Sequence, residues 1–212
     1  MDRIALKAMA KEQIKGKIGI LLAISVIISG IIFVANKIPI AGGIVTTFFL
    51  TPAFSLSMIL IYFKVSEGNP ISVGDAFEGF YHFWGAFKVT FLAGLFTFLW
   101  SLLLIVPGII KSYSYSMALY IYAENKDMGA LEAINKSKEM MEGHKMDLFV
   151  LQLSFLGWTL LGVVTLGIAF IWVIPYMYAT YVNFYKSLKP AEFVDIPAED
   201  IQIEEVSDNN EE

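Results

Sequence analysis

Long apolar runs separated by short polar stretches dominate the sequence. Six of these runs approach or reach the roughly 17–25 residues that a helix needs to cross about 30 Å of hydrocarbon. We therefore predict an all-α membrane protein with six transmembrane helices, at about residues 18–35, 40–63, 87–106, 108–123, 147–164 and 167–186. The fourth run is short and contains Lys111, so a re-entrant or strongly tilted segment is the alternative for it.

The basic residues fall almost entirely on one side of this topology. Only Lys37 and Lys111, of 15 Lys and Arg, fall on the other side, and every Asp and Glu lies on the Lys-rich side. The positive-inside rule therefore places both termini in the cytoplasm. The opposite face is left with three tight turns, at residues 36–39, 107–108 and 165–167, which are too small to build an active site.

One unit, an amphipathic cytoplasmic helix followed by a transmembrane hairpin, occurs three times. Residues 100–103 (Trp-Ser-Leu-Leu) and 158–161 (Trp-Thr-Leu-Leu) match at an offset of 58 positions. Pro52 and Pro175 each lie ten residues before a tyrosine in the second helix of their hairpins. We therefore predict three repeats within one polytopic membrane domain, residues 1–189.

The first amphipathic segment has a basic stripe, because a basic residue recurs at every fourth position: Arg3, Lys7, Lys11 and Lys15. A helix with such a face can lie at a membrane surface, where each basic residue contributes about 1 kcal/mol toward anionic lipid. We predict that these residues contact lipid headgroups. The alternative is that their charges only orient the first span.

The second amphipathic segment begins with Ser72 and Asp75, which have the spacing of a capping box. Aromatic residues then follow at helical spacing: Phe77, Phe80, Tyr81 and Trp84. We predict that these residues form an aromatic belt at headgroup depth. A groove for a partner or a site for a lipid headgroup is the alternative.

The third amphipathic segment carries both an apolar and a charged side. Leu131, Ile134 and Met141 are expected to form the apolar side, which packs against the base of the helix bundle. Glu132 and Lys136 have the i,i+4 spacing of a favourable ion pair.

Composition excludes several classes of function. The chain is 57% hydrophobic and 17% charged, with a mean hydropathy of +0.64, against roughly 45–50% and 25% in soluble domains. The absence of Cys excludes a disulfide scaffold and a cysteine nucleophile. His82 and His144 lack metal-ligand spacing, and no nucleotide-binding motif is present. We therefore predict neither an enzyme nor a metal or cofactor site, and the scattered basic residues predict no nucleic-acid partner.

The formal net charge of −5 conceals a division of the chain. Residues 190–212 contain nine of the 20 acidic residues and no Lys or Arg, which leaves residues 1–189 with a net charge of +4. We therefore predict a disordered, acidic cytoplasmic tail attached to a basic membrane body.

Two features keep a transport function open. Pro52 and Pro175 interrupt equivalent helices of two repeats, which is typical of a midplane binding site, and Tyr113 and Tyr181 supply hydroxyls nearby. Ion-coupled transport is unsupported, because no predicted span has a carboxylate or His in its interior. Lys111 is expected to reach the outer interface instead.

The second half of the sequence resembles a known family. Residues 99–111, which include Pro107-Gly108, and residues 141–145 (Met-Glu-Gly-His-Lys) resemble a bacterial family of integral membrane proteins designated domain of unknown function 975. The resemblance extends over roughly residues 1–188 and implies a location in the bacterial cytoplasmic membrane, but no established activity. The family commonly has Pro where this chain has Lys126. The chain is also distantly similar to the membrane domain of some glycerophosphodiester phosphodiesterases, which implies an anchoring or modulating role.

Our leading functional prediction is a non-catalytic membrane protein that organises or modulates membrane lipids, above all anionic ones, from its cytoplasmic face. A membrane protein partner or a second copy of the chain is a further expected contact. The alternative is a small permease or channel subunit with its site between the helices interrupted at Pro52 and Pro175.

Overall fold

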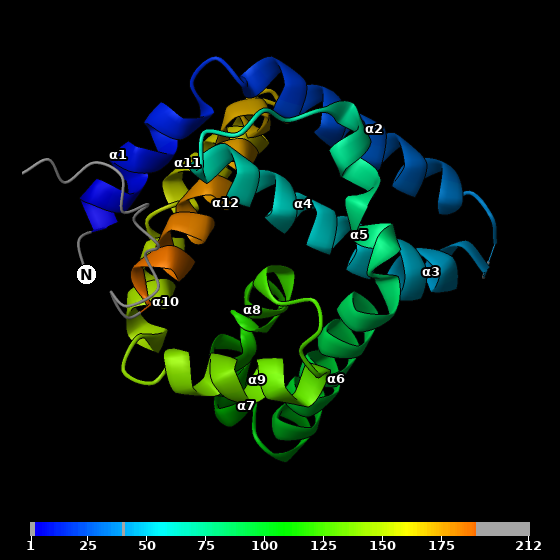
Figure 1. Ribbon diagram of the computed structural model, residues 1–212, viewed down its shortest axis with the longest axis vertical. Coiled ribbons are helices and arrows are strands. Elements are labelled where there is room, and N and C mark those ends of the chain that lie inside the picture. The colour runs from blue at the N-terminus through cyan, green and yellow to red at the C-terminus, as the bar shows by residue number, and fades with distance from the viewer. Residues whose placement is uncertain (1–2, 40, 190–212) are drawn as a thin grey trace, which may run out of the picture.

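The computed structural model describes residues 3–39 and 41–189, and all the regular structure in these residues is helical (Figure 1). The prediction of an all-α fold is therefore confirmed, whereas the predicted tail at 190–212 lies outside the described residues. The elements are α1 (Arg3–Ile14), α2 (Ile18–Ala35), α3 (Ala41–Val45), the π-helix η1 (Thr46–Leu50), α4 (Thr51–Ser66), the 3-10 helix η2 (Val73–Phe77), α5 (Glu78–Tyr81), α6 (Phe83–Leu103), α7 (Ile105–Tyr115), α8 (Ala118–Glu124), α9 (Ala130–Met140), α10 (Lys145–Leu153), α11 (Leu156–Val164) and α12 (Phe170–Ser187).

Within the described residues, four helical stretches are long and apolar enough to span a membrane: Ile18–Ala35, Ala41–Ser66, Phe83–Leu103 and Lys145–Val164. They overlap the first, second, third and fifth predicted spans. The fourth predicted span is two short helices, α7 and α8, and the sixth is α12, which is rich in tyrosine. The structure thus has the helices of a membrane protein, and the count of six spans stays a prediction.

The turn after α6 differs from the predicted one. Leu104 alone is extended, with φ −157° and ψ 140°, and α7 begins at the next residue. The prediction of a turn at Pro107-Gly108 was therefore wrong, because both residues lie inside α7. Pro107 falls in the first turn of the helix, where its missing N–H costs no hydrogen bond. Gly108 lets the two helices approach, since a Cβ there would collide with Ser101.

The second apolar stretch is not a uniform helix. The π-helix η1 runs directly into α4, and Pro52 lies at their junction, in the first turn of α4 and within the continuous helical stretch Ala41–Ser66. The Thr51 hydroxyl donates to the Thr46 carbonyl at 2.9 Å, which satisfies one backbone acceptor in the π-helical segment. Pro175, in contrast, lies inside α12.

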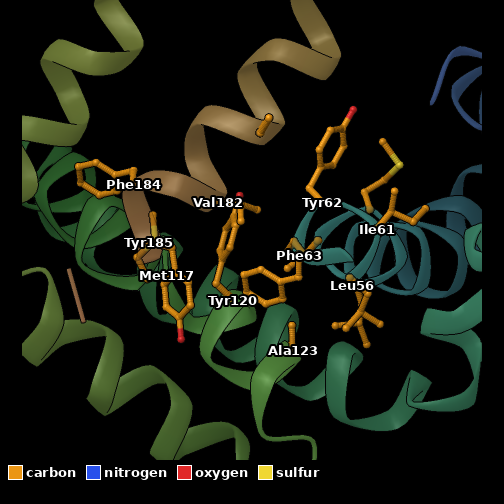
Figure 2. Packing of buried hydrophobic residues seen from close by; sticks show 14 of the residues in the cluster. Leu56, Ile61, Tyr62, Phe63, Met117, Tyr120, Ala123, Val182, Phe184 and Tyr185 are labelled. Atoms are coloured by element: carbon orange, nitrogen blue, oxygen red, sulfur yellow. The ribbon is translucent and has the colours of Figure 1, made fainter. Parts of the chain in front are cut away.

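The core lies where the second halves of α4 and α12 meet α8. The rings of Phe63, Tyr120 and Tyr185, one from each of these helices, are neighbours in Figure 2. Their ring centroids are 6.4 Å apart between Phe63 and Tyr120, 5.7 Å between Phe63 and Tyr185, and 5.6 Å between Tyr120 and Tyr185. Aromatic pairs at such distances add about 0.5–1.5 kcal/mol each beyond the area they bury.

The amphipathic helices α5 and α9 are each held by a helix that precedes them in the chain. Ser57 of α4 accepts a hydrogen bond from the Gly79 backbone N–H of α5 at 2.8 Å. The Ser137 hydroxyl of α9 donates to the Ser114 carbonyl at 2.8 Å and accepts from the Met117 N–H at 3.2 Å. Ser137 therefore satisfies backbone groups exposed by the break between α7 and α8.

The same arrangement joins the two ends of the chain. Asn183 of α12 donates its side-chain amide to the Gln13 side chain at 2.9 Å and to the Leu6 carbonyl at 3.4 Å, both on α1. Figure 1 shows α1 lying beside α12. With this contact, each of the three amphipathic helices packs on the second helix of a hairpin, and the second helices meet one another at the core. We call this arrangement the ring.

Ion pairs connect the same parts of the ring. Lys64 of α4 lies 3.1 Å from Asp75 and 2.8 Å from Glu78, which also lies 3.6 Å from Lys126. Lys186 of α12 pairs with Glu67 at 3.0 Å, and Lys189 pairs with Glu124. These pairs join segments that are 11 to 119 residues apart, so they support the ring rather than individual helices.

The ends of the hairpins, in contrast, have exposed apolar side chains. At the α6–α7 turn, Leu102, Leu103, Leu104, Ile105 and Val106 are all exposed, and at the α11–α12 turn Val163, Val164, Leu166 and Ile168 are exposed. Contiguous apolar surface of this kind is rare on soluble monomers and marks contact with a membrane or a partner.

Candidate functional site: the amphipathic helices

Helix α1 packs one face on α12 and presents its basic stripe to the outside. Leu6, Ala10 and Ile14 are buried, as expected for residues that recur every fourth position along one helix face. Arg3, Lys11 and Lys15 of the predicted stripe are exposed. Three of the four predicted lipid-contact residues are therefore accessible, although lipid contact itself stays a prediction.

Lys7, the fourth residue of the stripe, is turned inward. Its ammonium lies 4.1 Å from the centroid of the Phe155 ring and 3.4 Å from the Ser154 carbonyl, at the junction of α10 and α11. Burial, followed by the nearby charge of Arg3, lowers the pKa of Lys7 below its usual value. Lys7 thus differs from the other three residues of the stripe, because α1 lies against a helix junction that sequence spacing does not place; its contact with lipid stays a prediction.

A groove of about 360 Å³ lies between α1, α11 and α12. Its lining residues are Lys11, Ile14, Trp158, Trp172, Val173 and Tyr176. We name it the α1 groove. The two tryptophans and Tyr176 were not predicted as site residues, although Trp158 was visible as the repeat-equivalent of Trp100.

The aromatic stripe of the second segment is exposed along its whole length. Tyr81 and Trp84 are 86% and 68% exposed, and Phe77 and Phe80 are exposed but also contact the Phe54 ring. A wider groove of about 660 Å³ runs beside Phe80, Tyr81 and Trp84, and Tyr122 of α8 lines its far side. The four side chains are placed as an interfacial belt requires, and their contact with lipid stays a prediction.

The predicted capping box at the start of this segment is confirmed. The Ser72 backbone N–H donates to the Asp75 carboxylate at 2.8 Å, and the Ser72 side chain accepts the reciprocal bond. Burial acts to raise the pKa of Asp75, but the bond from Ser72 and the Lys64 ammonium outweigh it, so the pKa is lowered. The box fixes the direction in which the aromatic stripe leaves the ring.

The third amphipathic helix, α9, matches its prediction in part. Ile134 and Met141 are buried, and Lys136 pairs with Glu132 at 3.0 Å as expected. Leu131 is 55% exposed, so its placement on the packed face was wrong. The face that packs on α7 and α8 uses Ser137 instead, because the helix break there needs a hydrogen-bonding partner.

The four residues proposed for a transport site lie in different surroundings. Pro52 lines a groove between α4 and α6, whereas Pro175 lines a groove between α2 and α12. The Tyr113 hydroxyl donates to Gln152 at 2.8 Å, and Tyr181 packs edge-on against Phe155. Each residue thus has a local packing role, and the transport hypothesis stays a prediction.

The two lysines predicted for the outer side each lie over an aromatic ring. The Lys37 ammonium is 4.5 Å from the Phe33 centroid, and the Lys111 ammonium is 4.9 Å from the Trp100 centroid. A desolvated ammonium is stabilised in this way by about 0.5–2 kcal/mol. These contacts fit side chains that reach toward an interface, as predicted for Lys111.

Neither histidine belongs to a group of three or more possible metal ligands within the described residues. The His144 ring nitrogen Nδ1 lies 3.0 Å from the Asp147 carboxylate, in an i,i+3 pair at the start of α10. His82 terminates α5 and lines the aromatic groove. Within the described part of the chain, His144 thus contacts a single carboxylate, and His82 lies at a helix end.

The geometry defines a class of protein: a helical chain with apolar, membrane-length helices and amphipathic helices joined in a ring. The chain belongs to the family described as "Protein of unknown function (DUF975)", which matches it over residues 1–113 and 102–192. The predicted family is thereby confirmed. No curated protein and no solved structure matches the chain. The similarity to the membrane domain of glycerophosphodiester phosphodiesterases stays a prediction.

Proposed function

We propose that the protein is a non-catalytic, multi-pass protein of the bacterial cytoplasmic membrane that organises anionic lipid around its amphipathic helices. The observation that carries this proposal is the exposure of Arg3, Lys11 and Lys15 on a helix that the buried core holds in place. The exposed Tyr81 and Trp84 add an interfacial anchor on the next amphipathic segment.

The proposed topology is six spans in three repeats, with both termini in the cytoplasm. The order of elements supports it, because each of α1, α5 and α9 precedes a pair of helical arms. The chain has no Cys, so single cysteines can report topology without background. Leu104→Cys and Leu166→Cys are expected to react with an impermeant maleimide on intact cells, and Glu142→Cys only after lysis; labelling of all three only after lysis would refute this topology.

Lipid selectivity tests the function directly. The full-length protein is reconstituted in mixed bilayers, and spin-labelled phosphatidylglycerol and phosphatidylcholine report the lipid immobilised at its surface. We expect phosphatidylglycerol to be enriched, and the enrichment to fall when Arg3, Lys11 and Lys15 are changed to Gln, since each contributes about 1 kcal/mol. The matched control changes Lys136 and Lys138 of α9 to Gln. Equal immobilisation of both lipids by the unmodified protein would exclude the proposed function.

A further inference from the structure

The α1 groove combines one charge with apolar walls. Trp158 of α11 and Trp172 of α12 are half or more exposed, at 50% and 60%, although they line the groove. Ile14 and Val173 are buried. Lys11 is the single charged side chain among the lining residues. A ligand that fits this surface has an apolar chain and one anionic end.

Among the residues that the structure describes, no carboxylate forms an ion pair with the Lys11 ammonium. Within the described residues, Lys11, Arg3 and Lys7 have no carboxylate within ion-pairing distance, and Lys7 is held over the Phe155 ring one turn away. The lysines of the ring behave differently, since Lys64 and Lys186 each contact a carboxylate at 3.1 Å or less. Lys15, at the end of the basic stripe, lies 3.8 Å from the Glu12 carboxylate in an exposed pair. Lys11 is therefore the residue of the stripe that combines exposure with a place in the groove, and its charge can attract an external anion.

The size of the groove also fits part of a lipid. Its volume of about 360 Å³ lies within the roughly 300–1,000 Å³ of small-molecule sites. Exposed apolar residues flank both tryptophans, Leu160 and Leu161 beside Trp158 and Ile171 and Ile174 beside Trp172, so the groove lies within the surface that a bilayer would cover. Tyr176, whose ring packs edge-on against Phe155, joins the walls to the residue beneath Lys7.

We propose that the α1 groove binds one anionic phospholipid, with its phosphate at Lys11 and one acyl chain along Trp158 and Trp172. This site rests on the proposed function, because it names the place where lipid selectivity is concentrated. Charge complementarity selects the anionic headgroup, and the apolar walls select the acyl chain over a free phosphate.

Native mass spectrometry of the full-length protein tests this site. Phosphatidylglycerol and phosphatidylcholine are titrated separately, and glycerol 3-phosphate is the soluble headgroup control. We expect the first phosphatidylglycerol to bind more tightly than phosphatidylcholine, and glycerol 3-phosphate not to compete. Lys11→Gln is expected to weaken that first binding about five-fold, in line with the loss of one basic residue at a lipid surface.

A second variant tests the apolar walls independently of charge. The double variant Trp158→Ala, Trp172→Ala is expected to weaken the binding of both lipids, because it removes the apolar walls. Neither side chain is buried, so we expect the variant to fold. The matched controls are Lys111→Gln and Trp100→Ala, which remove a lysine and a tryptophan that lie together elsewhere. If the unmodified protein prefers phosphatidylglycerol but the groove variants bind it unchanged, this site is wrong and the proposed function stands. If the unmodified protein shows no preference, both fail.

Discussion

Asn183 joins the last helix of the ring to the first, and its removal should loosen α1. The side chain is 3% exposed, and its amide donates to Gln13 at 2.9 Å and to the Leu6 carbonyl at 3.4 Å. Unlike the contacts of α5 and α9, which follow their partner helices closely in sequence, this one spans 170 residues. No short loop connects α1 to α12, so these hydrogen bonds contribute directly to holding the two helices together.

The magnitude follows from the groups left without partners. Asn183→Ala leaves the partly buried Gln13 side chain without this partner, whereas the Leu6 carbonyl keeps its bond within α1. A fully buried unpaired polar group costs about 1–3 kcal/mol, which is the upper bound here. Interhelical hydrogen bonds measured in membrane proteins contribute less, about 0.6 kcal/mol on average and 1.7 at most. Both contacts of Asn183 lie beside the buried Ala10. We therefore expect Asn183→Ala to lower the free energy of opening of α1 by about 1–2 kcal/mol.

Hydrogen exchange of the α1 amides measures this opening. A loss of about 1–2 kcal/mol corresponds to exchange about 5–30 times faster, whereas α4 should change little. Asn36→Ala is the matched control, because the Asn36 amide donates within its own helix, to the Ile32 carbonyl at 2.9 Å. In a double-mutant cycle, Asn183→Leu with Gln13→Leu should recover most of the loss, since two apolar groups replace both partners. Unchanged exchange of α1 in Asn183→Ala would refute the closure of the ring by this residue.

Three further changes test the ring at other points. Ser137→Ala should destabilise the protein by about 1–3 kcal/mol in a thermal or urea unfolding series, because the backbone groups at the α7–α8 break lose their partner. Gly79→Ala should lower the unfolding midpoint, since a Cβ would collide with the Ala53 carbonyl, whereas Gly94→Ala, with open space around it, should be neutral or stabilising by up to about 1 kcal/mol. Because the pKa of Asp75 is lowered in the folded protein, the ionised carboxylate stabilises the fold above the unfolded pKa of 3.8, and this stabilisation is lost as the pH falls through the folded pKa. Asp75→Asn should remove this acid dependence, as measured by hydrogen exchange of the η2 amides.

The spans were predictable where they depend on apolar length alone. Residues 18–35 of the sequence coincide with α2 at both ends. The break between α7 and α8 was not predictable, because it is stabilised by Ser137 of another helix, more than 20 residues away. The turn at Leu104 has no local signal either, since Leu has no preference for turns, and the nearby Pro107-Gly108 gave a misleading one.

In the candidate site too, the local features could be predicted from the sequence and the tertiary ones could not. A basic residue at every fourth position of α1 is visible in the sequence, and so is the capping box that starts the aromatic segment. The groove beside Lys11 is not, because Trp158 and Trp172 lie about 150 residues further along the chain and come near α1 only through tertiary packing, to which Asn183 and Lys7 contribute. Local periodicity thus identifies which residues can face a membrane, but tertiary packing decides which of them share a site.

The distribution of burial links the ring to the proposed function. Side chains are buried around Phe63, Tyr120 and Tyr185, whereas the hairpin ends expose Leu, Ile and Val. Lipid hydrocarbon is as apolar as Leu, so a bilayer could surround these exposed side chains without any change in the core. In the function proposed above, the ring would place α1 and the aromatic segment at the boundary between the two environments. If α1 were mobile, ordering it on lipid would cost about 1–2 kcal/mol per residue. Asn183 and the buried Leu6 and Ile14 already order α1 in the protein, so the proposed binding of an anionic headgroup at Lys11 would not carry this cost.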